Sequence, residues 1–204
     1  MNTSISVAQP GPGDGGVWRA ACGLALVTLL GFGLAYAAAG TWLAAALFPA
    51  QAQGSLLRDG QRVLGSALLA QPFADARYFQ PRPSAAKYDP MAAAGSNLAR
   101  SNPELAQRIA QARAAVAARE GIDPAQVPAD LLTQSGSGLD PDISPAAAAL
   151  QVPRVAAARG LPQARVAALL REHVQPRQFG VFGQPRVNVL MLNLALDRQQ
   201  GAPQ

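Results

Sequence analysis

The longest apolar run of the chain lies near its start. From Ala20 to Phe48 the sequence contains no charged residue, whereas a helix that crosses a bilayer needs only about 20 apolar residues. Trp18 and Trp42 would lie roughly 36 Å apart along such a helix, a distance that suits the two interfacial belts of a membrane. We therefore predict a transmembrane helix over residues 17–48, preceded by a flexible, Gly/Pro-rich leader over residues 1–16.

Small residues recur at every fourth position of this predicted helix, at Gly31, Ala35 and Ala39. A small-xxx-small pattern forms a smooth strip on one helix face and lets another membrane helix approach closely. An Ala-rich composition can produce the same spacing by chance, so the two interpretations have equal weight. If the strip is functional, it predicts a packing face for a partner helix.

A cleaved secretory signal is the alternative to an anchor, because Ala50-Gln51-Ala52 resembles a small-x-small cleavage signature. Signal h-regions span about 7–15 residues and follow a basic segment, whereas this run is much longer and only Arg19 precedes it. We expect an uncleaved anchor. The charges leave its orientation open, since Arg19 on one side against Arg58 and Arg62 on the other leans only weakly toward a cytoplasmic C-terminal domain.

Residues 49–204 have the length and the recurrent apolar positions of one folded domain. Two short apolar runs around Asp59-Gly60 predict a hairpin, and the dense apolar run RVNVLMLNLALD at 186–197 predicts a buried strand. Capping residues and Gly or Pro stops predict three helices. These helices cover 103–120 with Asn102 or Ser101 as N-cap, a stretch that begins at Ser144-Pro145 and ends at Gly160, and a stretch from Pro162 to about His173. Helices and a few strands without regular alternation indicate an α+β fold.

Charge and cysteine content change this picture little. The chain has 17 basic and 12 acidic residues, a net charge of +5, and the charges are interspersed along the domain. No basic stripe typical of a nucleic-acid surface stands out, so we expect no nucleic-acid partner. The single cysteine, Cys22, lies inside the apolar run and therefore predicts no disulfide in the domain.

The run LLTQSGSGLDPDIS, residues 131–144, is the most polar candidate for chemistry. It lacks the lysine of a phosphate-binding P-loop. A nucleophile at Ser135 or Ser137 would need a base, and the one histidine, His173, has no spacing that joins it to them. One Cys and one His exclude a tetrahedral metal centre, and Asp140 and Asp142 lack the further oxygen ligands of a calcium loop.

A helix-turn-helix is a further interpretation of the segment that follows, because two helices are divided at ARGLP and carry four arginines. No recognition helix with Asn, Gln and Arg on one face appears, so this interpretation is weak. A shaped loop explains the polar run better: Gly136 and Gly138 permit positive φ, Pro141 fixes φ, and Ser144 caps a helix.

Three blocks of the chain closely resemble a known family. They are QPFADARYFQPRPSAAKYDPMAAAGSNLARSNPEL, VPADLLTQSGSGLDPDISPAAAALQVPRVAAARGL and FGQPRVNVLMLNLALD. In this order they are similar to the KdpC subunits of the Kdp potassium-transporting ATPases of bacteria. The similarity runs from the anchor to Asp197, and only the extended N-terminal leader looks peculiar.

The resemblance implies a single-pass inner-membrane subunit with a cytoplasmic N-terminus and a periplasmic domain over residues 49–204. Its implied partners are a channel-like potassium-binding subunit, a P-type ATPase subunit and the lipid bilayer. It implies a non-catalytic role in assembling and stabilising that complex, and a "catalytic chaperone" role that raises the ATP affinity of the ATPase subunit. ATP and potassium would be handled by the complex, so we expect no cofactor and no active site in this chain.

Two sets of residues follow from the resemblance as expectations. If nucleotide were contacted directly, Gln151 in LQVPRV is the residue to examine, although an ordinary polar helix residue is the simpler interpretation. We also expect the 77–102 and 133–145 loops to dock on the potassium-binding subunit at its outer pore mouth. The residues expected in these loops are Tyr78, Arg82, Pro83, Ser84, Asn97 and Asn102, and Ser135, Gly136, Ser137, Gly138, Asp140, Pro141, Asp142 and Ser144.

Overall fold

The computed structural model describes residues 14–200 and divides them into two compact units that meet at Gly54 and Ser55. The first unit is an apolar helix: α1 (Asp14–Val27), a π-helical segment η1 (Thr28–Ala35) and α2 (Tyr36–Leu47), followed by one short turn, α3 (Pro49–Ala52). The leader predicted for residues 1–16 lies, up to residue 13, outside the described residues.

The apolar helix is exposed on every side. Its stretch Gly15–Leu47 is 33 residues long and contains an 18-residue window with a mean hydropathy of 1.9, so it is long and apolar enough to cross a membrane. Trp18 and Trp42 are exposed, as are the leucines between them. A helix that is apolar all round needs cover from lipid or from other helices. This helix therefore indicates a single-pass membrane protein.

The second unit begins with the hairpin that the sequence predicted. Strands β1 (Leu56–Asp59) and β2 (Arg62–Ser66) pair antiparallel, with Asp59 opposite Arg62. Gly60 occupies the turn at φ +56°, a conformation that glycine adopts without steric cost. The predicted hairpin is confirmed.

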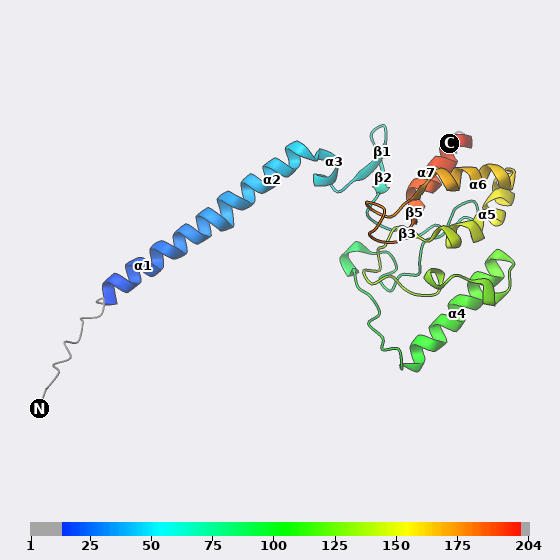
Figure 1. Cartoon of the computed structure of the whole chain (residues 1–204), viewed down its shortest axis with the longest axis horizontal. Coiled ribbons are helices and arrows are strands. Elements are labelled where there is room, and N and C mark those ends of the chain that lie inside the picture. The colour runs from blue at the N-terminus through cyan, green and yellow to red at the C-terminus, as the bar shows by residue number, and fades with distance from the viewer. Residues whose placement is uncertain (1–13, 201–204) are drawn as a thin grey trace, which may run out of the picture. The chain divides into compact units, whose positions relative to one another are not determined.

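The body of this unit surrounds one hydrophobic core and is an α+β arrangement, as predicted (Figure 1). Its helices and short helical turns are η2 (Pro90–Ala92), α4 (Pro103–Glu120), η3 (Pro124–Gln126), η4 (Ala129–Leu131), α5 (Pro145–Arg159), α6 (Gln163–Glu172) and α7 (Val189–Gln200). A three-stranded antiparallel sheet in the order β3-β5-β4 contains β3 (Asp142–Ile143), β5 (Arg186–Asn188) and β4 (Val174–Gln175). Phe79, Ala147, Val155, Val187 and Leu192 are fully buried between these elements.

Local capping chemistry sets the helix boundaries. The Asn102 side chain accepts a hydrogen bond from the Glu104 amide at 2.9 Å, and Gly121 ends α4 in the left-handed conformation. Ser144 accepts from the Ala147 amide at 3.0 Å, and Gly160 ends α5 in the same way. These caps satisfy donors and acceptors that every helix end leaves free, and the predicted bounds of both helices are confirmed.

The predicted C-terminal strand is wrong over most of its length. Only Arg186–Asn188 is extended, and Val189–Gln200 is helical. Asn188 accepts a hydrogen bond from the Met191 amide at 3.0 Å and so serves the start of the helix. Val189, Leu192, Asn193 and Leu196 are buried, and their i, i+3, i+4, i+7 spacing is helical. The branched apolar composition concealed this period.

Candidate functional site

Side chains of α5 and α7 hold the loop segment Ala76–Gln80, which begins in a turn and which we call the clamped segment. Each of its five successive backbone carbonyls accepts a side-chain hydrogen bond. Arg154 donates to Ala76 and Tyr78, Arg159 to Arg77, Asn193 to Phe79, and Gln151 to Gln80. Backbone carbonyls that lose contact with water without such partners are costly, so these four side chains supply the donors that the carbonyls of the segment need.

Gln151 is fully buried within this arrangement. Its Oε1 accepts from the Gln80 amide at 2.7 Å and from Arg154 at 2.8 Å, and its Nε2 donates to the carbonyls of Gln80 and Ala147 at 3.1 and 3.2 Å. A side-chain amide offers two donors and two acceptor lone pairs, and these bonds use all four. The placement favours a structural role for Gln151 over direct contact with a nucleotide.

Asn193 repeats the arrangement from the opposite side. Its Oδ1 accepts from the Phe79 amide at 2.8 Å and its Nδ2 donates to the Phe79 carbonyl at 3.0 Å. Phe79 itself is fully buried in the core. Two buried amides from α5 and α7 thus fix consecutive residues, and both amides are satisfied as buried polar groups must be.

Charged groups hold the first three residues of the clamped segment. Arg154 makes two bonds to Glu120 at 2.9 and 3.1 Å, and the Glu120 side chain is completely buried. Arg159 pairs with Asp197 at 2.8 Å and lies 4.9 Å from the ring centre of Tyr78, whose hydroxyl also bonds Asp197. Tyr78, expected to face a partner, is therefore engaged inside the domain.

The Ser-Gly run is a turn shaped by its own hydroxyls. Ser135 Oγ accepts from the amides of Gly138 and Asp140, and Ser137 Oγ accepts from the Leu139 amide at 3.1 Å. Gly138 has φ +73°, and a Cβ there would lie 2.8 Å from the Ala94 carbonyl oxygen. The hydroxyls that resembled nucleophiles are occupied in holding this turn.

The two loops expected to dock on a partner pack against each other. Ser84 donates to the Gly138 carbonyl at 2.6 Å, and the Ser135 amide donates to the Pro83 carbonyl at 3.2 Å. Gly95 approaches Gly136 so closely that a Cβ would lie 2.7 Å from its oxygen. The 77–102 and 133–145 loops therefore form one joined surface, which we call the loop face.

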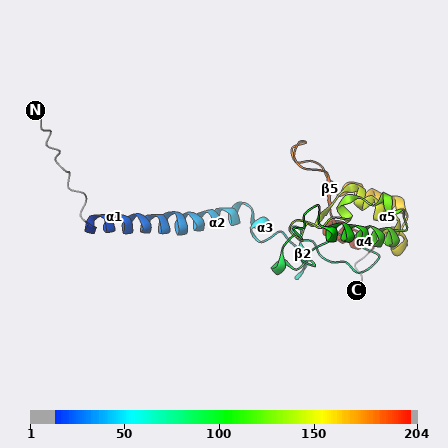
Figure 2. The same ribbon diagram turned by 90° about the horizontal axis from the view of Figure 1, so that it is seen from below.

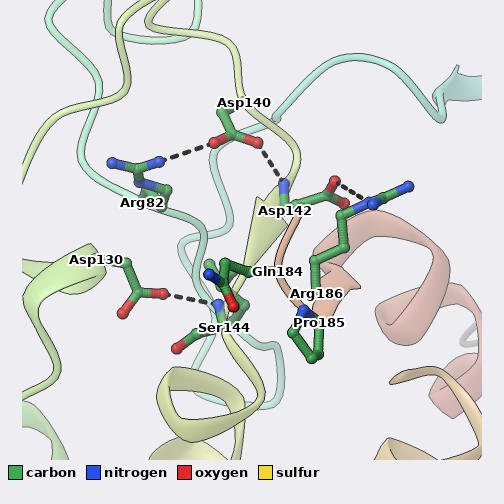
Figure 3. Close-up of a pocket in the computed structure, with 9 residues that line it drawn as sticks. Arg82, Asp130, Asp140, Asp142, Ser144, Gln184, Pro185 and Arg186 are labelled. Carbon is green, nitrogen blue, oxygen red and sulfur yellow. Dashed lines mark hydrogen bonds and ion pairs between the residues drawn. The ribbon is translucent and has the colours of Figure 1, made fainter. Parts of the chain in front are cut away.

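A pocket of about 410 Å³ opens beside β3 and is lined by three charged residues of this surface, Arg82, Asp140 and Asp142 (Figure 3). Arg82 pairs with Asp140 at 2.9 Å, and Arg186 pairs with Asp142 at 3.0 Å. Asp140 also accepts from the Asp142 amide at 3.0 Å. Each carboxylate thus has a cationic partner, and the residues that the structure describes contain no cluster of three metal-binding side chains.

Burial raises the pKa of the Asp142 carboxyl above its ordinary value, and the charge of Asp140 raises it further. The Arg186 guanidinium and a hydrogen bond with Asn188 oppose that rise in pKa. Asp130 accepts from the Ser144 amide at 2.7 Å across the same pocket. In this pocket carboxylates bond the backbone just before α5 and so fix where that helix starts.

The other candidate groups are separated. His173 Nδ1 contacts the Leu169 carbonyl of its own helix at 2.8 Å and lines a pocket that contains neither Ser135 nor Ser137. Arg154 and Arg159 turn inward, whereas Arg165 and Arg171 bond Gln199 and the Ala167 carbonyl. The four arginines do not form one face of a recognition helix.

In the apolar helix, the strip of Gly31, Ala35 and Ala39 begins in the π-helical segment. Gly31 and Ala35 lie in that segment, and Ala39 lies in α2. All three residues are exposed, as is the rest of the helix.

Sequence reasoning missed the clamped segment and its four holding side chains as a unit. Two local signals could have indicated it: an asparagine inside an apolar run, and arginines on a helix that is otherwise rich in Ala and Val. Buried polar groups of this kind require partners, but their partners lie 71 to 114 residues away in sequence.

The chain was compared with known proteins. The family model described as "KdpC: K+-transporting ATPase, c chain" matches residues 18–198. A protein of Xanthomonas campestris pv. campestris (strain B100) named "Potassium-transporting ATPase KdpC subunit" is 65% identical over 198 residues, which is 97% of this chain and 92% of that protein. Proteins of the same name from Shewanella putrefaciens and Sorangium cellulosum are 52% and 53% identical; the matches cover 85% of this chain in both cases and 87% and 92% of those proteins.

The matched region contains the apolar helix from residue 18 onward, both packed loops and all four side chains that hold the clamped segment. The family identified from the three sequence blocks is the family that these comparisons show. The chain belongs to the KdpC family of subunits of the potassium-transporting ATPase.

Proposed function

We propose that this chain is a non-catalytic accessory subunit that holds an ATP-driven potassium uptake complex together in the inner membrane. The observation that carries the proposal is the family match over residues 18–198, which includes the membrane-type helix and the whole described body of the domain. The helix anchors the chain with its N-terminus in the cytoplasm, and residues 49–204 lie in the periplasm. The partners are a channel-like potassium-binding subunit and a P-type ATPase subunit.

The packing of the polar side chains supports an accessory role. Gln151 is buried with all four amide positions bonded, and the hydroxyls of Ser135 and Ser137 bond neighbouring backbone amides. Such groups define a rigid surface and leave little polar chemistry for a reaction. The loop face then serves as a preformed docking surface over the outer mouth of the potassium-binding subunit.

Any effect on ATP affinity is indirect in this proposal. ATP is cytoplasmic and the domain lies outside, so the two sites are coupled through the membrane helices as a coupling free energy. The strip of Gly31, Ala35 and Ala39 supplies the close helix contact through which that coupling passes. The chain raises the nucleotide affinity of the ATPase subunit by stabilising its assembled conformation.

The test replaces the strip in the complete complex. The double variant Gly31→Leu/Ala35→Leu should lose the partner subunits during purification in mild detergent, because leucine side chains prevent close approach of helices. Gly33→Leu is the matched control, since it adds the same side chain to the same helix at a position outside the strip. Equal recovery of partner subunits with both variants would contradict the packing role.

A further inference from the structure

The chain between β4 and β5 projects from the domain as a hairpin with an apolar end. All of the residues 176–185 are exposed, and Figure 2 shows this brown segment standing clear of the domain body. Phe179, Val181 and Phe182 are 84%, 68% and 66% exposed. We call these three side chains the apolar tip. Exposed apolar clusters on a folded domain mark interaction sites.

Internal hydrogen bonds hold the hairpin in one conformation although it is exposed. The amides of Gln178 and Phe182 donate to each other's carbonyl oxygens, both at 2.9 Å, and the Gly180 amide donates to the Arg177 carbonyl at 3.1 Å. Arg177 also donates to Gln184 across the base at 3.0 Å. Phe179 has φ +54°, an uncommon conformation for a bulky residue. The backbone is thus held in a strained form that directs an aromatic side chain away from the domain.

We propose that the apolar tip inserts into an apolar pocket on the extramembrane surface of a membrane-spanning partner subunit of the same complex. The inference rests on the proposed function as an accessory subunit and adds the contact by which the domain is held. A pocket in a protein rewards a preorganised aromatic anchor, because little conformational freedom is lost on binding. A lipid surface would accept the same side chains in any arrangement and needs no strained hairpin.

The size of the tip distinguishes a tethered partner from a free one. Aromatic side chains bury about 150–250 Å² each, so two phenylalanines and a valine remain below the roughly 800 Å² per partner of a stable interface. The tip alone cannot hold a second soluble copy of this chain. A chain already anchored beside its partner binds through a small contact, because the anchor supplies a high effective concentration.

The charge at the base of the hairpin indicates which charge the rim of the partner's pocket carries. Arg177 is the one charged residue in 176–185, and its guanidinium sits at the base of the hairpin through its bond to Gln184. A partner pocket with an apolar floor and an acidic rim is complementary to this arrangement.

Photo-crosslinking in the assembled complex tests the contact directly. We would replace Phe179 by p-benzoyl-phenylalanine and irradiate the membrane-embedded complex, with the same replacement at Leu68, which is 59% exposed and lies outside the loop face, as control. The expected result is a crosslink from position 179 to one membrane-spanning subunit and none from position 68. Crosslinks to lipid alone, to a second copy of this chain, or to nothing would overturn the inference.

A second variant measures the strength of the contact. Phe179→Ser/Phe182→Ser should dissociate from the complex in detergent at least about tenfold faster than the natural chain, the effect of removing a central aromatic anchor. Leu68→Ser, which also removes an exposed apolar side chain but lies outside the loop face, should leave the rate unchanged. Equal rates would overturn the inference, whereas failure of the unaltered chain to co-purify with any partner would overturn the proposed function as well.

Discussion

Replacing Gln151 by Leu removes all four hydrogen bonds of its amide while keeping an apolar side chain of similar size. The Gln80 amide, the Gln80 carbonyl and one nitrogen of Arg154 then lose their partner. Each unsatisfied buried group costs about 1–3 kcal/mol, so the variant should lose about 3–5 kcal/mol after the added apolar burial is counted. This is a large part of the roughly 5–15 kcal/mol that stabilises a typical domain.

Hydrogen exchange in the purified complex measures this effect at the residue concerned. The Gln80 amide should exchange at least about tenfold faster in Gln151→Leu, because each 1.4 kcal/mol of lost protection is a factor of ten. Gln107→Leu on the exposed side of α4 is the control and should not change exchange. The reasoning is refuted if Gln151→Leu leaves exchange at residues 77–80 unchanged but raises the KM for ATP, since that pattern requires direct nucleotide contact.

Three further predictions follow from single contacts. Gly138→Ala should lower the free energy of unfolding by roughly 2–4 kcal/mol, because it combines a left-handed backbone with a clash against Ala94. Gly160→Ala is also left-handed but has nothing within 4 Å, so it should lose only about 1–2 kcal/mol. Equal losses in denaturant unfolding would contradict the clash. Ser144→Ala should cost about 1 kcal/mol in the same assay by removing the cap of α5, and no loss would contradict the capping role. Burial and the charge of Asp140 raise the pKa of Asp142 in the folded state, so the folded state binds this proton more tightly than the unfolded state. Relative to Asp142→Asn, the natural chain should therefore gain stability as pH falls from neutral through the raised pKa to the ordinary value of 3.8. A loss of stability over that interval would contradict the direction of the pKa shift.

Elements with local signals were predictable from the sequence. The bounds of α4 and α5 are set by Asn102, Gly121, Ser144 and Gly160, each within a few residues of the helix end that it caps. The hairpin at Asp59-Gly60 follows from a two-residue turn between apolar runs. In each case the free energy that decides the structure comes from neighbours in the chain.

The failures have a common cause in distant contacts. The run 186–197 is rich in branched apolar residues, which favour a strand locally, yet burial of Val189, Leu192 and Leu196 on one face makes most of it a helix. The clamped segment depends on Asn193, which is 114 residues from Phe79. No periodicity or motif within either segment reports such a partner.

The most direct test of the proposed function is to measure on which side of the membrane the domain lies. A variant with Cys22→Ala and Gln107→Cys has one thiol, placed on the exposed side of α4 and outside the loop face. A membrane-impermeant maleimide should label this thiol fully in intact spheroplasts, because the proposed function places the domain in the periplasm and transmits its effect on ATP affinity through the membrane helices. Labelling that appears only after the membrane is opened would place the domain in the cytoplasm and contradict the account.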